Sequence, residues 1–105
     1  MTSDECKENI KKLDLSRELK LEIVNIHYGK NYKRSCNILI NCKDCKTGIL
    51  FFFSTFSTIG YKTKNGDFNF QEYLQKDTIK TNNKIIATFA LTKTGFLDCL
   101  SAKLA

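Results

Sequence analysis

The chain has 105 residues, of which 42% are hydrophobic and 27% are charged, and its formal net charge is +6 at pH 7. These values are ordinary for a globular protein and exclude a disordered or fibrous chain. A chain of this length buries about two-thirds of its unfolded surface on folding, which suffices for one core. We therefore expect a single domain spanning residues 1–105.

No apolar run approaches the length of a membrane span, and the first residues are polar rather than typical of a secretory signal. The number of cysteines is odd, and their spacing is not that of a disulfide-rich secreted domain: Cys6, Cys36, Cys42, Cys45 and Cys99. We expect reduced thiols, no membrane span and an intracellular protein, cytoplasmic or nuclear.

The positive charge is concentrated in the later part of the chain. Residues 1–27 carry five basic and six acidic side chains, whereas residues 28–105 carry the other twelve basic and five acidic ones. A field of this sign favours polyanionic partners, with nucleic acid first and an acidic protein surface second.

The N-terminal part predicts a helix followed by a strand. Thr2 and Glu5 have the spacing of a capping box, which predicts a helix over residues 4–12. Apolar residues over 15–23 fit both a helical and an alternating pattern, so we expect a helical start that passes into a strand at residues 22–28.

The middle of the chain predicts a β-hairpin. Alternating residues share one face of a half-buried strand: Cys36, Ile38, Ile40 and Cys42. A turn at residues 43–48 follows. In the run ILFFFSTF, both the odd-numbered and the even-numbered positions are largely apolar, which favours a central strand covered on both faces.

The C-terminal half predicts a second hairpin, a helix, a strand and a last helix. Asn65-Gly66 is a strong signal for a tight turn. Asn69 and Glu72 have the spacing of a helix cap, and the run KIIATFALT favours a strand. The segment 96–104 places apolar residues on a helical stripe, which predicts a C-terminal helix.

The fold class expected from these elements is α+β. We expect a three- or four-stranded, mainly antiparallel sheet with hairpins around residues 43–48 and 65–66, packed by helices that include the C-terminal one.

Cys42 and Cys45 have the spacing of one knuckle of a zinc ribbon, in a turn closed by Gly48. A tetrahedral site needs two more ligands, and Cys36 would lie about 20 Å from Cys42 along an intact strand. Cys99 and His27 are the remaining candidates. The alternatives are a redox pair, disfavoured because no helix follows the motif, and a polar turn with incidental thiols and no cofactor.

Two segments interleave basic and aromatic residues. Basic side chains suit phosphate contacts, and tyrosine rings can stack on unpaired bases. The candidate nucleic-acid-binding residues are Lys30, Tyr32, Lys33, Arg34, Lys62 and Lys64. The phenylalanines of residues 51–56 do not match the aromatic pattern of an RNA-recognition sheet, so we assign them to the core.

No phosphate-binding glycine loop, metalloprotease helix or paired-carboxylate signature is present, which favours a non-catalytic protein. The leading hypothesis is a small intracellular binding module that contacts single-stranded nucleic acid or RNA through a basic surface. The alternatives are a protein-interaction or inhibitor domain that acts through an apolar sheet face or edge, as a homodimer in one version, and a zinc-stabilised module.

Overall fold

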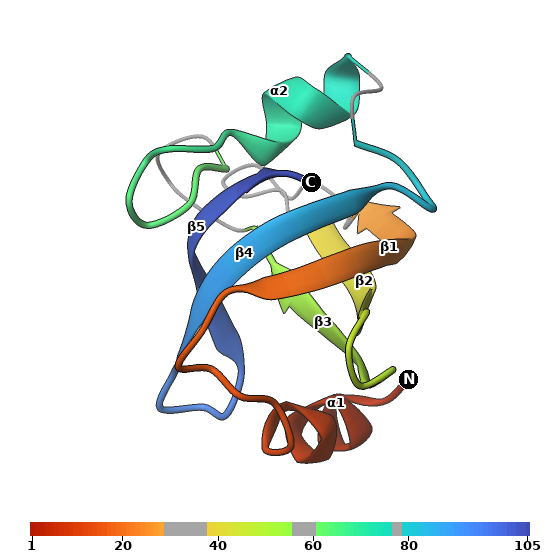
Figure 1. Ribbon diagram of the computed structural model, residues 1–105, viewed down its shortest axis with the longest axis vertical. Coiled ribbons are helices and arrows are strands. Elements are labelled where there is room, and N and C mark those ends of the chain that lie inside the picture. Colours follow the sequence, from red (N-terminus) through yellow and green to blue (C-terminus); the bar gives the residue numbers. More distant parts are fainter. Residues whose placement is uncertain (29–37, 56–60, 77–78) are drawn as a thin grey trace.

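The computed structural model describes residues 1–28, 38–55, 61–76 and 79–105. In chain order, the elements are α1 (Ser3–Ile10), β1 (Leu19–Tyr28), β2 (Ile38–Asp44), β3 (Leu50–Ser54), α2 (Phe70–Gln75), β4 (Lys84–Leu91) and β5 (Leu97–Leu104). Figure 1 shows the strands between the two helices, with α1 at one end and α2 at the other.

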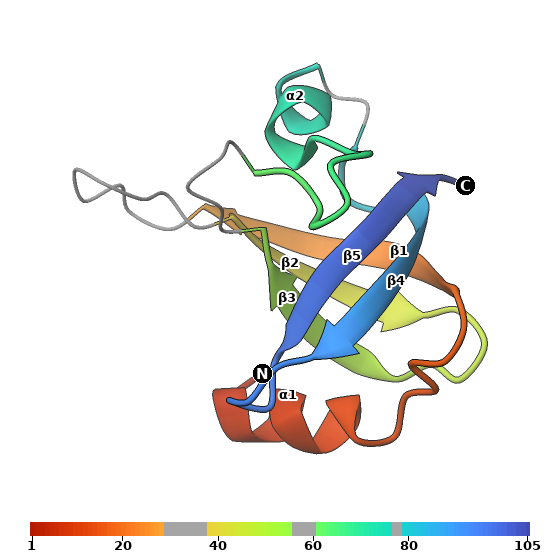
Figure 2. The same ribbon diagram turned by 90° about the vertical axis from the view of Figure 1, so that its left-hand side faces the viewer.

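The five strands form one antiparallel sheet in the order β3-β2-β1-β4-β5. Three consecutive strands form a meander, and β4 returns beside β1, which is the Greek-key arrangement. The two outermost strands, β3 and β5, contact each other although no ladder joins them in the described part of the chain. The sheet therefore curves into a partly open barrel, visible in Figures 1 and 2.

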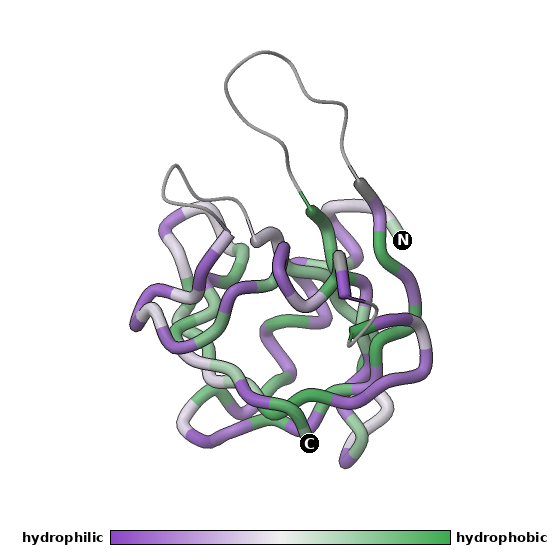
Figure 3. The backbone as a smooth tube through the Cα atoms, turned by 90° about the horizontal axis from the view of Figure 1, so that it is seen from above, coloured by the Kyte–Doolittle hydropathy of each residue, from purple (hydrophilic) through white to green (hydrophobic). Residues whose placement is uncertain are grey.

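The core fills the inside of this barrel. Inward residues alternate with outward ones along β2 and β4, and Figure 3 shows hydrophobic and hydrophilic positions interspersed along the chain that rings the core. Phe53 lies at its centre, with its ring centroid 5.0 Å from that of Phe89 and 5.9 Å from that of Phe70. Burial of each side chain of this size stabilises the folded state by roughly 1.5–3 kcal/mol relative to leaving it exposed.

A β-bulge lets β1 serve both halves of the barrel. Residues 19–22 pair with β4 and residues 21–28 pair with β2, with a register shift between Ile23 and Asn25 in the pairing with β2. The extra residue is Val24, so Val24 and Asn25 are both exposed on the outside. A bulge bends the strand and increases its twist, which this curved sheet requires.

Helix α1 covers the free edge of β3. Its capping box is formed as predicted, with Thr2 Oγ1 accepting from Glu5 N at 3.1 Å and Glu5 Oε1 accepting from Thr2 N at 3.3 Å. The Phe52 N–H lies 3.4 Å from Cys6 Sγ, and Asn9 Nδ2 donates to Leu50 O at 2.7 Å. Side chains of α1 therefore bond backbone groups that an edge strand would otherwise leave open.

The α+β class is confirmed, but the expected strand count is wrong because the segment taken for a C-terminal helix is the strand β5. Phe89 pairs with Cys99, whereas Thr88 pairs with Ser101, so Leu100 is an extra residue in a bulge. The buried positions of β5 are Leu97, Cys99 and Ala102. The helix was expected from a stripe of Phe96, Leu97, Leu100 and Leu104, but only Leu97 of these is buried, since Leu100 lies in the bulge and Leu104 is 44% exposed.

Two further expectations differ from the structure. The chain before β1 has no helical segment between residues 15 and 19, and β1 begins at Leu19. Strand β3 ends the sheet order rather than lying at its centre, with Phe51 and Phe53 buried and Phe52 half-exposed.

Both expected hairpin turns are present. In the first, Asp44 N donates to Ile49 O at 2.9 Å. In the second, Thr63 N donates to Phe68 O at 3.0 Å and Gly66 N donates to Thr63 O at 2.9 Å. Of the pair Asn65-Gly66 only the glycine has positive φ, so this turn is not the type I′ turn that the dipeptide favours.

The two helices of the described ranges are both too short to cross a bilayer, and neither meets the apolar requirement for doing so.

Candidate ligand-binding face

The residues considered as zinc ligands lie in different surroundings. Cys42 and Cys99 are buried inside the barrel, whereas Cys45 is exposed in the β2–β3 turn and His27 is exposed near the end of β1. Among the residues that the structure describes, no group of three or more His, Cys, Asp or Glu side chains could hold a metal ion. Cys36 lies outside the described residues.

Burial also keeps the two interior thiols protonated. It raises the pKa of Cys99 to about 12 and the pKa of Cys42 well above its usual range. Metal binding and thiol redox chemistry both require the thiolate. These two side chains therefore behave as small apolar core residues.

A buried carboxylate organises the turn that carries Cys45. Asp44 is 1% exposed, and its carboxylate accepts from Thr47 Oγ1 at 2.7 Å and from Lys46 N at 3.3 Å. Gly48 closes the turn with φ +76° and donates its N–H to Asp44 O at 2.7 Å. Sequence reasoning missed Asp44, although aspartate favours turns by bonding the backbone N–H two residues later, as it does here with Lys46.

The basic residues expected to bind nucleic acid are only partly described. Lys30, Tyr32, Lys33 and Arg34 lie outside the described residues. Lys62 and Lys64 are both exposed. Lys64 Nζ lies 3.9 Å from Asp98 Oδ2. Lys62 acts on Glu72: the pKa of this carboxyl is lowered mainly by its hydrogen bond to Lys76, and the charge of Lys62 lowers it slightly further.

The outward side of β1, β2 and β3 carries two rows of paired residues that suit ligand binding. In one row, His27 pairs with Leu39, which pairs with Ser54. In the other row, Asn25 pairs with Asn41, which pairs with Phe52. Directly opposed residues have Cβ atoms about 5 Å apart, so each row is a continuous strip of side chains.

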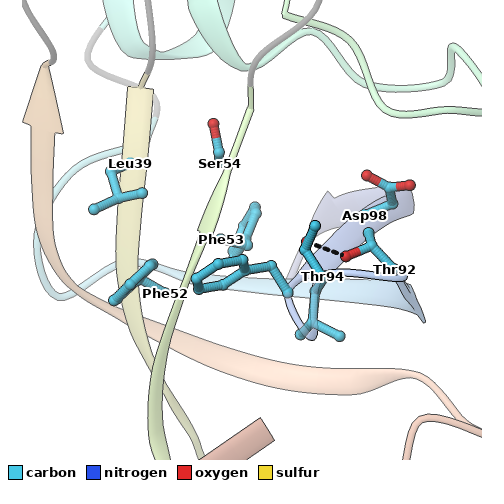
Figure 4. Close-up of a pocket in the computed structure, with 9 residues that line it drawn as sticks. Leu39, Phe52, Phe53, Ser54, Thr92, Thr94 and Asp98 are labelled. Atoms are coloured by element: carbon cyan, nitrogen blue, oxygen red, sulfur yellow. Dashed lines mark hydrogen bonds between the residues drawn. The ribbon is translucent and has the colours of Figure 1, made fainter. Parts of the chain in front are cut away.

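Two depressions lie on this side of the barrel. The strand depression, of about 550 Å³, has among its lining residues Met1, Val24, Asn25, His27, Asn41 and Leu50. The hairpin depression, of about 440 Å³, lies between β3 and the β4–β5 hairpin, and its lining residues include Ser54, Thr92, Thr94, Phe96 and Asp98 (Figure 4). Leu39 and Phe52 line both, so we treat the two as one outer face.

An aromatic pair lies at the centre of the outer face. The Phe52 and Phe96 rings are stacked, with centroids 6.0 Å apart and an interplanar angle of 28°, and both side chains are half-buried. Lys7 Nζ of α1 lies 4.9 Å from the centroid of the Phe96 ring. Sequence reasoning placed Phe52 in the core with its neighbours. Residues two apart in a strand share a face, so the polar Ser54 was a signal that Phe52 faces outward.

No protein-family model, no curated protein and no solved structure matches this chain.

Proposed function

We propose that this protein is a small non-catalytic module that binds single-stranded nucleic acid across its outer face. The observation that carries the proposal is the half-exposed aromatic pair Phe52 and Phe96, set beside the side-chain amides of Asn25 and Asn41. Aromatic rings stack on unpaired bases of any sequence, at about 1–3 kcal/mol per base. Amide side chains can hydrogen-bond to the exposed edges of the same bases.

The architecture supports this choice by analogy. A five-stranded, partly open Greek-key barrel is the architecture of OB folds, which bind oligonucleotides on strands two and three and on the loops that join strands one to two and four to five. Here the outer face spans β2 and β3 and is flanked by the β4–β5 hairpin. Architecture alone does not assign function, so the side chains of the face remain the main argument.

The position of the basic segment in the chain also supports the proposal. Lys30, Lys33 and Arg34 fall between β1 and β2, the two strands that carry His27 and Leu39 on the outer face. Three cations joined to this face by so few residues would add phosphate contacts to the stacking contacts.

The experiment is fluorescence anisotropy with a labelled thymine strand of about ten nucleotides, within the site size of one such barrel. We expect salt-sensitive binding. The salt dependence is measured as the slope of the logarithm of the binding constant against the logarithm of the salt concentration. Replacing Lys30, Lys33 and Arg34 together by Ala should reduce the magnitude of this slope by about 2, at roughly 0.7 per cation for single strands. The control replaces Lys11, Lys12 and Lys80, which are exposed and line neither depression.

No binding of DNA or RNA at low salt would contradict the proposal. An equal loss of slope in the control variant would show that binding follows net charge and not the outer face.

A protein partner, in the simplest case a second copy of the chain, is the second candidate for the same face. Three large apolar side chains that line the strand depression are unusually exposed, with Met1 at 52%, Val24 at 42% and Leu50 at 44%. Exposed apolar residues that gather in one depression are typical of protein interfaces. Size-exclusion chromatography with light scattering tests this candidate, because Leu50→Lys should abolish a dimer that forms here.

A further inference from the structure

The hairpin depression differs from the strand depression in one respect, because it contains a carboxylate. Asp98 is the one acidic side chain among the described residues that line either depression. In Figure 4, Asp98 lies on the same side as Thr92 and Thr94 of the β4–β5 hairpin, whereas Leu39, Phe52 and Ser54 lie on the other side. A ligand in this depression would therefore have the Phe52 ring, the aliphatic carbons of Leu39 and one hydroxyl on one side, and a carboxylate with two hydroxyls on the other.

The Asp98 carboxylate is accessible to a ligand. Its side chain is 46% exposed, and its contact with Lys64 Nζ is 3.9 Å long, with the lysine side chain 65% exposed. Ion pairs this open to water contribute little to stability, so a ligand can replace one of the partners at little cost. Lys64 can therefore turn to a phosphate while Asp98 accepts hydrogen bonds from a ligand.

The charge of Asp98 decides which part of a nucleotide faces it. A phosphate would be repelled by the carboxylate, whereas an N–H group of a base would be attracted to it. The Thr92 and Thr94 hydroxyls are joined by a hydrogen bond of 2.9 Å, in which one of them donates, so the other can still donate to the base and both can accept from it.

Guanine is the base whose edge matches a carboxylate best. Its Watson–Crick edge presents two adjacent donors, N1–H and the N2 amino group, which can reach both oxygens of one carboxylate. Adenine and cytosine place a ring acceptor beside their amino donor, and thymine and uracil place an acceptor on each side of their single donor. In those four bases, the carboxylate would face a lone pair.

We infer that the hairpin depression is a subsite for an unpaired guanine, with the base against Phe52 and its N1–H and N2 amino group donating to Asp98. The inference rests on the proposed function, because it names the base that this part of the outer face prefers. The preference is a property of Asp98, whereas general strand binding depends on stacking and on the basic residues.

The test compares three labelled strands that differ at one central position. A thymine strand of about ten nucleotides is used alone, with one guanine, or with one inosine, which lacks the N2 amino group. We expect the guanine strand to bind about tenfold more tightly than the thymine strand, with inosine between them. In the Asp98→Asn variant this ratio should fall to near one.

The matched control is Asp14→Asn, which removes the same charge at an exposed residue that lines neither depression. Ratios within one protein cancel the general gain in affinity that loss of an acidic group brings. Competition of guanosine monophosphate against adenosine monophosphate then tells whether a free nucleotide suffices or the strand is needed.

Two results overturn the inference. Equal binding of the three strands, or a guanine preference that survives in Asp98→Asn, contradicts the subsite and leaves strand binding in place. Failure of all three strands to bind contradicts both the subsite and the proposed function.

Discussion

Three neighbouring phenylalanines of β3 have different roles because alternate residues of a strand point to opposite sides. Phe51 and Phe53 are each 1% exposed and form the core with Phe89, whereas Phe52 is half-buried beside Phe96. The inward pair stabilises the fold, and the outward ring is available to a ligand.

Phe52→Leu should therefore weaken binding of a single strand with little effect on folding. Leucine keeps an apolar contact to Phe96 but lacks the π face, so we expect a loss of about 1–3 kcal/mol in binding free energy. Fluorescence anisotropy measures the loss, and Leu91→Ala is the control because Leu91 is 58% exposed and lines neither depression. If the Phe52→Leu variant binds the strand with wild-type affinity, the Phe52 ring does not stack on a base.

The buried thiols make the free energy of unfolding fall at alkaline pH. Burial raises the pKa of Cys99 to about 12, from an ordinary value of 9.0 that the unfolded chain retains. The unfolded state therefore loses its proton first. The contribution of Cys99 is fully present below pH 9 and is lost as the pH rises towards 12, at up to about 1.4 kcal/mol per pH unit.

Cys99→Ala should remove this part of the pH dependence. Urea denaturation at pH 8, 9 and 10 measures the free energy of unfolding of both proteins, and we expect the difference between wild type and variant to shrink as the pH rises. Ionisation of lysines and tyrosines affects both proteins alike. A difference that stays constant over this range would contradict the assignment.

At the scale of the element, the sequence predicts best the features that depend on a few adjacent residues. The Thr2–Glu5 capping box, the Asn69 cap of α2 and the two hairpin turns are present because each is made by side chains and backbone within a short stretch of neighbouring residues. The bulges were not predictable in this way. They shift the inside–outside alternation in β1 and β5, and in β5 the apolar spacing that suggested a helix over residues 96–104 does not mark the buried positions of the strand.

The β2–β3 turn offers a test of local conformation. Gly48 has φ +76°, and an added Cβ would meet nothing within 4 Å, so the cost of a side chain there is conformational alone. Gly48→Ala should lower the free energy of unfolding by about 1–2 kcal/mol. Gly48→Asn should lose less, since asparagine tolerates this region better, and Lys46→Ala in the same turn should change little.

Chemical denaturation of the four proteins measures these differences. Equal stability of Gly48→Ala and wild type would contradict the turn conformation.

At the scale of the whole molecule, the site arises from contacts that no local pattern specifies. The β4 strand returns beside β1, and β3 meets β5 without a ladder between them, over long separations in the chain. The hairpin depression lies at this junction, so Leu39 and Asp98 line the same depression only once the barrel has formed. Sequence reasoning identified basic and aromatic candidates but could not find a face built from three separate segments.

The most direct test of the central claim is a titration of the ¹⁵N-labelled protein with a thymine strand, followed by ¹H–¹⁵N correlation spectra. The account predicts that the shifted amides belong to the outer face, with Asn41, Phe52 and Thr94 among them, and that Ile86 and Thr88, which line neither depression, do not move. Shifts confined to residues that line neither depression, such as Ile86, Thr88 and Ser101, or no shifts at saturating strand concentrations, would contradict it.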